Sequence, residues 1–270
     1  MGLGGHLTWT AAAREIKKKT GLVSVPVNGN NIVTDDIFKN NPNFSFDTSD
    51  GKEKIILDLG KPETNYCIAD LPDRAIQKTD KHIIETICEH YDIFDPELKC
   101  DLFFTEEELE KARGLIKDLP LRFLVIEPHS KTSYSINRQY PLDKWQKVVN
   151  ELSEKFPIVQ VGVSGKRVLD SVVDLTGQTT FREAAAIIRL SSLLLSNEGG
   201  LGHAATATET KALIVLGGYT GAKMVCYPQN INIDVATHGP CGMKSHCSLC
   251  QEDYENHNYG EIVERALEVL

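Results

Sequence analysis

From Leu121 onward the sequence alternates short, wholly apolar runs with longer amphipathic segments, and this alternation constrains the fold more than any other feature. Apolar runs of this length are typical of strands covered on both faces, and the segments between them are typical of helices. Strands separated by helices at this spacing predict an α/β fold with a parallel, doubly wound sheet. The expected strands are Phe123 to Ile126, Pro157 to Val163, Val172 to Leu175, Leu193 to Ser196 and Ala212 to Leu216, and the expected helices are Pro141 to Phe156, Thr180 to Leu190, Gly200 to Thr208 and Tyr259 to Leu270.

The part of the chain before Leu121 is shorter and less regular. Its expected elements are a helix from Thr10 to Lys19, strands at Leu22 to Val25 and Lys54 to Leu59, and helices at Lys81 to His90 and Thr105 to Lys117. A chain of 270 residues allows one large domain or two small ones. A polar helix and Pro120 precede the first strong strand, so we expect two Rossmann-like domains, 1–120 and 121–270. Only Met1 precedes the first Gly-rich stretch, which predicts that the small first domain is truncated or lacks its first strand.

The overall composition excludes several classes of protein. The chain carries 29 basic and 38 acidic side chains, a net charge of −9. This acid excess argues against a general nucleic-acid binder, because such proteins need a clustered basic face. The sequence has no apolar stretch long enough to span a membrane and no signal peptide at its start. We therefore expect a cytoplasmic protein.

The most informative stretch runs from Leu193 to Thr208, where an apolar strand ends in a glycine-rich turn that opens a helix. Unpaired backbone N–H groups and the positive end of the helix dipole converge at such a turn and favour an anion. Glu198 stands at the strand end, where its carboxylate can accept hydrogen bonds from ribose or sugar hydroxyls. The alternative is a turn whose glycines serve packing only. The candidate binding residues are Glu198, Gly199, Gly200, Leu201, Gly202 and His203.

Two other loops follow expected strands and therefore reach the same edge of the sheet. The loop after Ile126 carries phosphate-binding donors on Ser130, Lys131 and Arg138, although a solvated polar connection would look similar. Trp145, in the following helix, is expected in the core. The turn after Leu216 contributes Thr220, which is a weak signal by itself.

The order of these motifs resembles that of glycosyltransferase family 9, the heptosyltransferases. The resemblance covers nearly all of 121–250, and the opening 2–18 is similar to the turn and helix with which the family begins. The motifs that carry it are Arg138 to Trp145, Asp174 to Gly177, Phe181 to Ile188, Ser196 to His203 and Gly217 to Thr220.

This resemblance implies a GT-B architecture, with two Rossmann-like domains facing a cleft. It implies inverting, metal-independent transfer of a sugar, such as a heptose, from a nucleotide-sugar donor, with an ADP-linked donor favoured. The acceptor would be a glycan, a lipid-linked molecule or a protein, and peripheral contact with the inner membrane face is compatible with it. By the same resemblance Glu198 stands where the family has a donor-binding Asp, Arg138 is the basic phosphate contact supported by Ser130 and Lys131, and Thr220 supplies a nucleotide-contacting hydroxyl.

The opening departs from the family at the residue that matters most for catalysis. Gly5 stands where the family carries the Asp assigned as catalytic base. His6 follows it, and an imidazole titrates near neutrality, as a general base requires. The alternatives are that His6 only caps the turn, that another acid such as Glu15 substitutes, or that the protein binds nucleotide sugars or glycans with weak or no activity. A different kind of enzyme, such as a GT-B-type sugar-nucleotide epimerase, is a further alternative.

Three of the seven cysteines gather near the C-terminal end, at Cys241, Cys247 and Cys250, with His238 and His246 close by. The spacing of Cys247 and Cys250 lets two thiolates bind one metal ion, and a third cysteine or a histidine can complete the set. We expect a structural zinc or iron ion there, with a disulfide or packed thiols as the alternative.

Overall fold

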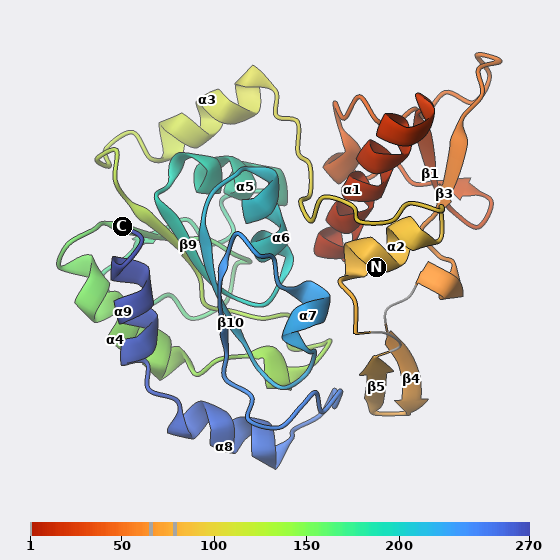
Figure 1. The fold of residues 1–270 in the computed structure, drawn as a ribbon. Helices are drawn as coiled ribbons and strands as arrows, with labels where there is room; N and C mark the ends of the chain where they lie inside the picture. The colour runs from red at the N-terminus through yellow and green to blue at the C-terminus, as the bar shows by residue number, and fades with distance from the viewer. Residues whose placement is uncertain (1, 65–66, 78–79) are drawn as a thin grey trace.

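The computed structural model describes residues 2–64, 67–77 and 80–270. Its larger part is built on a six-stranded parallel sheet in the order β11-β10-β9-β6-β7-β8 (Figure 1). The strands are β6 (Leu124–Glu127), β7 (Ile158–Gln160), β8 (Val173–Asp174), β9 (Leu193–Asn197), β10 (Ala212–Leu216) and β11 (Ile231–Asp234). Counted from β6, this is the 3-2-1-4-5-6 strand order of a doubly wound Rossmann sheet. The fold class expected from the alternation is confirmed.

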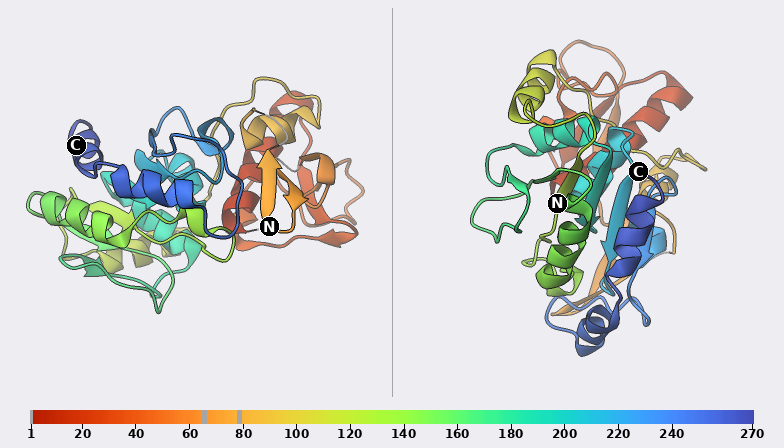
Figure 2. Two further views of the ribbon diagram at one scale, coloured as in Figure 1. Left: turned by 90° about the horizontal axis from the view of Figure 1, so that it is seen from below. Right: turned by 90° about the vertical axis from the view of Figure 1, so that its left-hand side faces the viewer.

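Helices cover both faces of this sheet, as the two views in Figure 2 show. Successive side chains of a strand point to opposite faces, so Leu124 and Ile126 pack with Trp145 in one core while Val125 packs in the other. The helices on the first face are α4 (Leu142–Ser153) and α9 (Gly260–Leu267), those on the second are α5 (Phe181–Leu190) and α6 (Gly200–Ala207), and the short α7 (Ala222–Val225) and α8 (Ser248–Asn256) follow β10 and β11.

The N-terminal part holds a smaller sheet with the order β2-β1-β3, in which β1 and β3 are parallel and β2 is antiparallel. The described helix α1 starts at Leu3, well before the expected Thr10, so Gly4 and Gly5 lie in its first turn. Gly21 ends it in the left-handed conformation that favours glycine. The elements here are α1 (Leu3–Thr20), β1 (Ser24–Asn28), β2 (Asn31–Ile32), η1 (Asp36–Phe38), β3 (Ile55–Asp58), η2 (Pro62–Thr64), the hairpin β4 (Cys67–Leu71) and β5 (Arg74–Gln77), α2 (Ile83–Glu89) and α3 (Glu106–Leu115).

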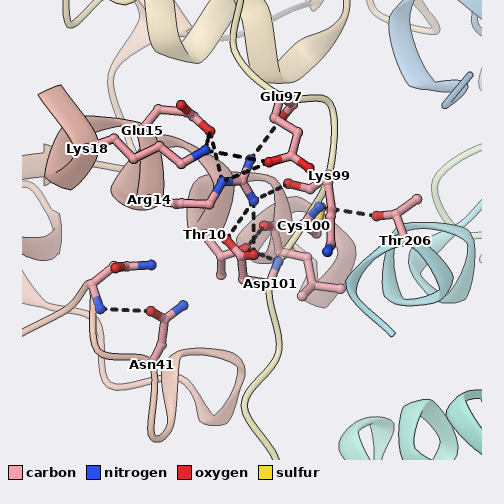
Figure 3. A network of polar contacts seen from close by, with 12 residues as sticks. Thr10, Arg14, Glu15, Lys18, Asn41, Glu97, Lys99, Cys100, Asp101 and Thr206 are labelled. Carbon is pink, nitrogen blue, oxygen red and sulfur yellow. Dashed lines mark hydrogen bonds and ion pairs between the residues drawn. The ribbon is translucent and has the colours of Figure 1, made fainter. Parts of the chain in front are cut away.

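The two parts are packed against each other along one continuous apolar core. Helix α1 packs against α6, and α3, which precedes residue 120, packs against α5. A polar network also fastens α1 to the segment that leads into the larger part (Figure 3). In it Arg14 Nη1 donates to both carboxylate oxygens of Asp101, at 2.9 and 2.8 Å, and the Cys100 N–H donates to Thr206 Oγ1 of α6 at 3.2 Å. The division of the chain at residue 120 stays a prediction.

Most expected helices and strands are present within a few residues of their predicted bounds. Sequence patterns missed β2, the β4–β5 hairpin, α7, β11 and α8. In β5, β11 and α8 the apolar residues are few or mixed with polar ones, and β2 and α7 are very short. Among the described helices, none combines the length and apolarity needed to cross a lipid bilayer.

Candidate active site

The candidate site lies at the carboxyl ends of β6 and β9, the two central strands of the large sheet. The strand order reverses between them, and ligands of doubly wound folds bind at this point. Glu127 is the last residue of β6, and Glu198 directly follows β9. Asn197 ties the two strand ends together, because its Nδ2 donates to the Pro128 carbonyl at 2.8 Å.

The glycine-rich turn after β9 opens helix α6, and the N-terminus of α1 lies directly against it. A methyl group on Gly4 would lie 2.8 Å from Cα of Gly200, so only a glycine lets the two backbones approach this closely. Within the described residues no hydrogen bond engages the N–H groups of Gly199, Gly200 or Leu201. Two helix N-termini, each with a partial positive charge, therefore meet at one place.

Arg138 and Glu198 form an ion pair beside this turn. Arg138 ends the 3₁₀ turn η3 (Ile136–Arg138), and its Nε donates to Glu198 Oε2 at 2.6 Å while Nη2 donates to the Glu198 carbonyl at 3.1 Å. The side chains are 14% and 11% exposed, so the pair is largely shielded yet still open to solvent. The two residues predicted separately as phosphate and sugar contacts are thus in direct contact.

Glu127 adds a second carboxyl group to this edge of the sheet. Burial raises its pKa to about 7, and the nearby positive charge of Arg138 offsets only part of that effect. Strong pKa shifts of this kind gather at functional sites. Its shifted pKa and its place at the end of β6 make Glu127 a further candidate residue of this site.

The other predicted donor-binding residues contribute in different ways. The Ser130 hydroxyl donates to the Arg138 carbonyl at 2.7 Å and so shapes the loop, while Lys131 is exposed. Leu201 and Thr220 are buried. The His203 ring points into the interior, where its Nδ1 and the Tyr227 hydroxyl are 2.6 Å apart.

The Gly202 N–H donates to the Gly199 carbonyl at 3.2 Å, and a methyl group added to Gly202 would lie 3.1 Å from Ile214 Cδ1. Burial lowers the pKa of His203 to about 4 and keeps its ring neutral. The structure therefore brings Arg138, Glu198 and the N–H groups of the turn together, whereas the side chains of Leu201 and His203 belong to the core.

His6 lies in the first turn of α1, two residues after the contact between Gly4 and Gly200. Its Nδ1 is 2.8 Å from Asp35 Oδ2, and its ring lies against Phe38 with 5.8 Å between ring centroids. Asp35 was not among the residues predicted for the site. A weak signal existed, since Asp is among the residues that helical turns prefer at their N-cap, and Asp35 caps η1.

The cysteine-rich segment forms a compact cluster next to the site. Ligand atoms of His238, Cys247 and Cys250 all lie within 4.8 Å of one another. Cys241 Sγ lies 3.4 Å from Cys250 Sγ, and the hydrogen bond from Cys250 lowers the pKa of Cys241 to about 6. The seven cysteines, all within the described residues, form no disulfide. His238 was only a neighbour of the predicted ligand set, and the structure places it inside the cluster.

The segment that carries this cluster holds the loops of the candidate site. The Cys241 N–H donates to the Gly218 carbonyl at 2.6 Å, and the Cys247 N–H donates to Asn137 Oδ1 at 3.0 Å. Asn137 directly precedes Arg138. The same segment pairs with the β4–β5 hairpin of the N-terminal part, where the Ala75 N–H donates to the Gly242 carbonyl at 2.9 Å.

A cavity of about 550 Å³ lies elsewhere, at the other end of α6. Its walls include Lys99, Thr206 and Lys211. Lys211 directly precedes β10, so this cavity lies at the amino edge of the sheet, away from the Arg138 and Glu198 pair.

A protein-family model, glycosyltransferase family 9 (heptosyltransferase), matches residues 85–249, more than half of the chain. The chain belongs to glycosyltransferase family 9. This membership confirms the resemblance drawn from the motif order and makes the protein a heptosyltransferase-like glycosyltransferase. No curated protein sequence matches the chain.

Solved structures share the fold of this family 9 protein. A family 9 glycosyltransferase from Veillonella parvula superposes with a TM-score of 0.69 at 11% identity, covering 100% of this chain and 94% of that one. ADP-heptose lps heptosyltransferase II from E. coli gives 0.65 at 12% identity, with 99% and 95% covered. The iron-containing dodecameric glycosyltransferase TibC from enterotoxigenic E. coli gives 0.61 at 14% identity, with 89% and 61% covered. The likeness supports the GT-B arrangement of two Rossmann-like parts.

Proposed function

We propose that this glycosyltransferase moves a heptose-type sugar from an ADP-linked donor to a hydroxyl group of a glycan, lipid-linked or protein acceptor, with inversion at the sugar carbon. The ADP-linked donor is favoured because one of the similar structures is an ADP-heptose heptosyltransferase, and TibC has been solved in complex with ADP-D-β-D-heptose. The acceptor hydroxyl attacks the sugar carbon, and the bond to the diphosphate breaks.

The observation that carries this proposal is the meeting of the two helix N-termini beside Arg138. A departing nucleoside diphosphate gains negative charge as its bond to the sugar breaks, and preformed positive groups stabilise that charge. The N–H groups of Gly199 to Leu201, the first turn of α1 and the Arg138 guanidinium would all face it. These groups supply the positive charge themselves, so we propose transfer without a divalent cation at the reacting bond.

Glu198 is proposed to bind the ribose or the sugar through its hydroxyl groups, and His6 to remove the proton from the acceptor hydroxyl. His6 is half-buried and lies on the turn of α1 that touches the glycine-rich turn. The competing hypothesis is a nucleotide-sugar-binding protein without activity. It is favoured by Gly5, which stands where the family has its catalytic Asp.

Calorimetry tests nucleotide binding, and a measurement of ADP release tests transfer; together they separate the two hypotheses. We expect binding of ADP and ADP-heptose, with weaker binding of the UDP- and GDP-linked compounds. We also expect ADP release when an extract containing glycan and lipid-linked acceptors is added, without any need for an added divalent cation. Binding without ADP release would indicate a nucleotide-sugar-binding protein without activity. If the ADP-, UDP- and GDP-linked compounds all fail to bind, both the glycosyltransferase and the binding protein are excluded.

The role of Glu198 is tested by Glu198→Gln. A hydrogen bond to a charged group contributes about 1.5–3 kcal/mol, so the dissociation constant for ADP-heptose should rise by about 10- to 100-fold. The control is Glu154→Gln, which makes the same change at an exposed position outside the site. Equal affinities in the two variants would contradict a donor contact by Glu198.

We further propose that His238, Cys247 and Cys250 hold a structural zinc or iron ion, with Cys241 beside them. Asp253 supports this fit, because its carboxylate lies 2.9 Å from His238 Nδ1 and leaves Nε2 facing the sulfur atoms. A carboxylate behind a histidine in this way is the usual second partner of a metal-binding imidazole. The ion would fix the segment that holds Asn137 and the β4–β5 hairpin.

Metal analysis of protein purified without chelator tests this site. We expect about one zinc or iron ion per chain, lost in Cys247→Ser and kept in Cys67→Ser, a control at a half-buried cysteine of β4. Loss of the ion should also expose the segment 237–250 to protease. A folded, metal-free wild-type protein would contradict the proposal.

A further inference from the structure

His6 and Asp35 form a side-chain pair that joins the start of α1 to the turn η1. His6 Nδ1 lies 2.8 Å from Asp35 Oδ2, and the side chains are 16% and 19% exposed. Asp35 Oδ1 accepts a hydrogen bond from the Ile37 N–H at 2.9 Å and so caps η1. Both oxygens of this carboxylate therefore have a partner, and its position is fixed from two sides.

This pairing selects one tautomer of the His6 ring. An ionised carboxylate can only accept hydrogen bonds, so Nδ1 must carry the hydrogen that is shared with Asp35. In a neutral imidazole the other nitrogen, Nε2, then holds a lone pair. Among the described residues no hydrogen bond is made to His6 Nε2. Phe38 lies against the ring at a tilt of 30° and supports its orientation.

The same geometry separates the role of His6 from that of Asp35. Both carboxylate oxygens of Asp35 are engaged, by His6 and by the Ile37 N–H, whereas His6 Nε2 is available to take a proton. The first turn of α1 also touches the glycine-rich turn through Gly4 and Gly200. In the proposed function the acceptor hydroxyl gives its proton to His6 Nε2, the ring nitrogen that Asp35 does not engage.

We propose that Asp35 is the positioning residue for His6, acting through the imidazole without touching the substrate. This inference rests on the proposed function. As the acceptor oxygen bonds to the sugar carbon, its proton passes to His6 Nε2. The sugar–phosphate bond breaks, and its electron pair leaves with the nucleoside diphosphate. Asp35 holds the ring with Nε2 unprotonated beforehand and stabilises the imidazolium that forms; the proton then passes to water.

The tautomer can be measured without any activity. Two-dimensional ¹⁵N–¹H NMR of the histidine rings at about pH 8 should show His6 protonated on Nδ1, with the His6 signals assigned by their loss in His6→Gln. In Asp35→Asn the amide oxygen keeps the cap on Ile37, and its NH₂ group faces the ring, so the hydrogen should move to Nε2. A wild-type ring protonated on Nε2 would overturn the inference and leave the proposed function standing.

Kinetics test whether this orientation is used. Asp35→Asn should lower kcat for ADP release from ADP-heptose by about 10²- to 10⁴-fold, with little change in donor KM, because general-base catalysis is worth about this factor. Asp36→Asn, the same change at the adjacent exposed residue, should leave kcat unchanged. In a His6→Ala background, Asp35→Asn should have no further effect, because a positioning residue acts only through its partner.

The outcomes are distinct. Full activity of Asp35→Asn alongside an inactive His6→Ala would overturn the role of Asp35 and keep His6 as base. A further loss from Asp35→Asn in the His6→Ala background would show that Asp35 acts on its own, which contradicts the proposal. Absence of transfer by the wild-type enzyme would refute the proposed function, and the inference with it.

Discussion

Replacing Gly4 by alanine tests most directly whether α1 and α6 meet at the candidate site. Gly4 has helical backbone, so alanine suits its conformation. The added methyl group would lie 2.8 Å from Cα of Gly200 and 3.0 Å from Cδ2 of His203. Neither neighbour can rotate away, because the first atom is backbone and the His203 ring is buried against Tyr227.

Carbon atoms in contact prefer separations of about 3.5–4.0 Å, so the two helices must part by roughly 0.7 Å or more. Overpacking of this kind costs about 1–3 kcal/mol, and the higher helix propensity of alanine returns about 1 kcal/mol. With two rigid neighbours we expect a net loss of about 1–2 kcal/mol. For a chain of this size that lowers Tm by about 2–8 °C.

Gly114→Ala is the matched control, because Gly114 is also helical and a methyl group there would meet nothing within 4 Å. It should stabilise the protein by about 0.5–1 kcal/mol. Urea unfolding compares the two variants, and calorimetry with ADP compares their affinities. Gly4→Ala should also bind ADP at least about 5-fold more weakly, since the two N-termini have moved apart. Equal unfolding free energies of Gly4→Ala and Gly114→Ala would contradict the close packing of α1 against α6.

Three further predictions concern charged and titratable groups away from the reacting atoms. Arg182→Met should destabilise the protein by about 3 kcal/mol in urea unfolding, because the buried guanidinium binds Glu108 and loss of one partner leaves the other unpaired. The Arg182 side chain lowers the pKa of Glu108 to about 2 from its ordinary 4.5. The ionised Glu108 therefore stabilises the fold fully above pH 4.5, and this contribution disappears as the pH falls toward 2. In Glu108→Gln the free energy of unfolding should change less with pH between 4.5 and 2. Burial lowers the pKa of His82 to about 3 from its ordinary 6.5. Between these two pH values the unfolded chain binds a proton that the folded chain does not, so the stability falls as the pH falls. His82→Gln should reduce this fall, and an unchanged pH profile of the unfolding free energy would contradict the burial of the His82 ring.

The sequence by itself determined the class of the fold and the order of the motifs. Whether a segment such as Leu193–Asn197 becomes a buried strand depends on its own apolar residues, and the glycines after it mark the turn. Because these properties are local, periodicity and turn chemistry predicted most helices and strands of the larger part. The same local rules failed for β11, in which polar and apolar residues are mixed, and for the start of α1, where glycines indicated a turn.

Tertiary structure alone decided which distant residues meet. Arg138 and Glu198 are 60 positions apart in the chain, and they form an ion pair because β6 and β9 are neighbours in the sheet. His6 and Asp35 are 29 positions apart and come together because η1 packs against α1. Contacts of this kind depend on the path of the chain and the order of the strands, which no local pattern encodes. The sequence therefore predicted candidate groups one by one, and only the packing of α1 against α6 and of η1 against α1 decided which distant residues became neighbours.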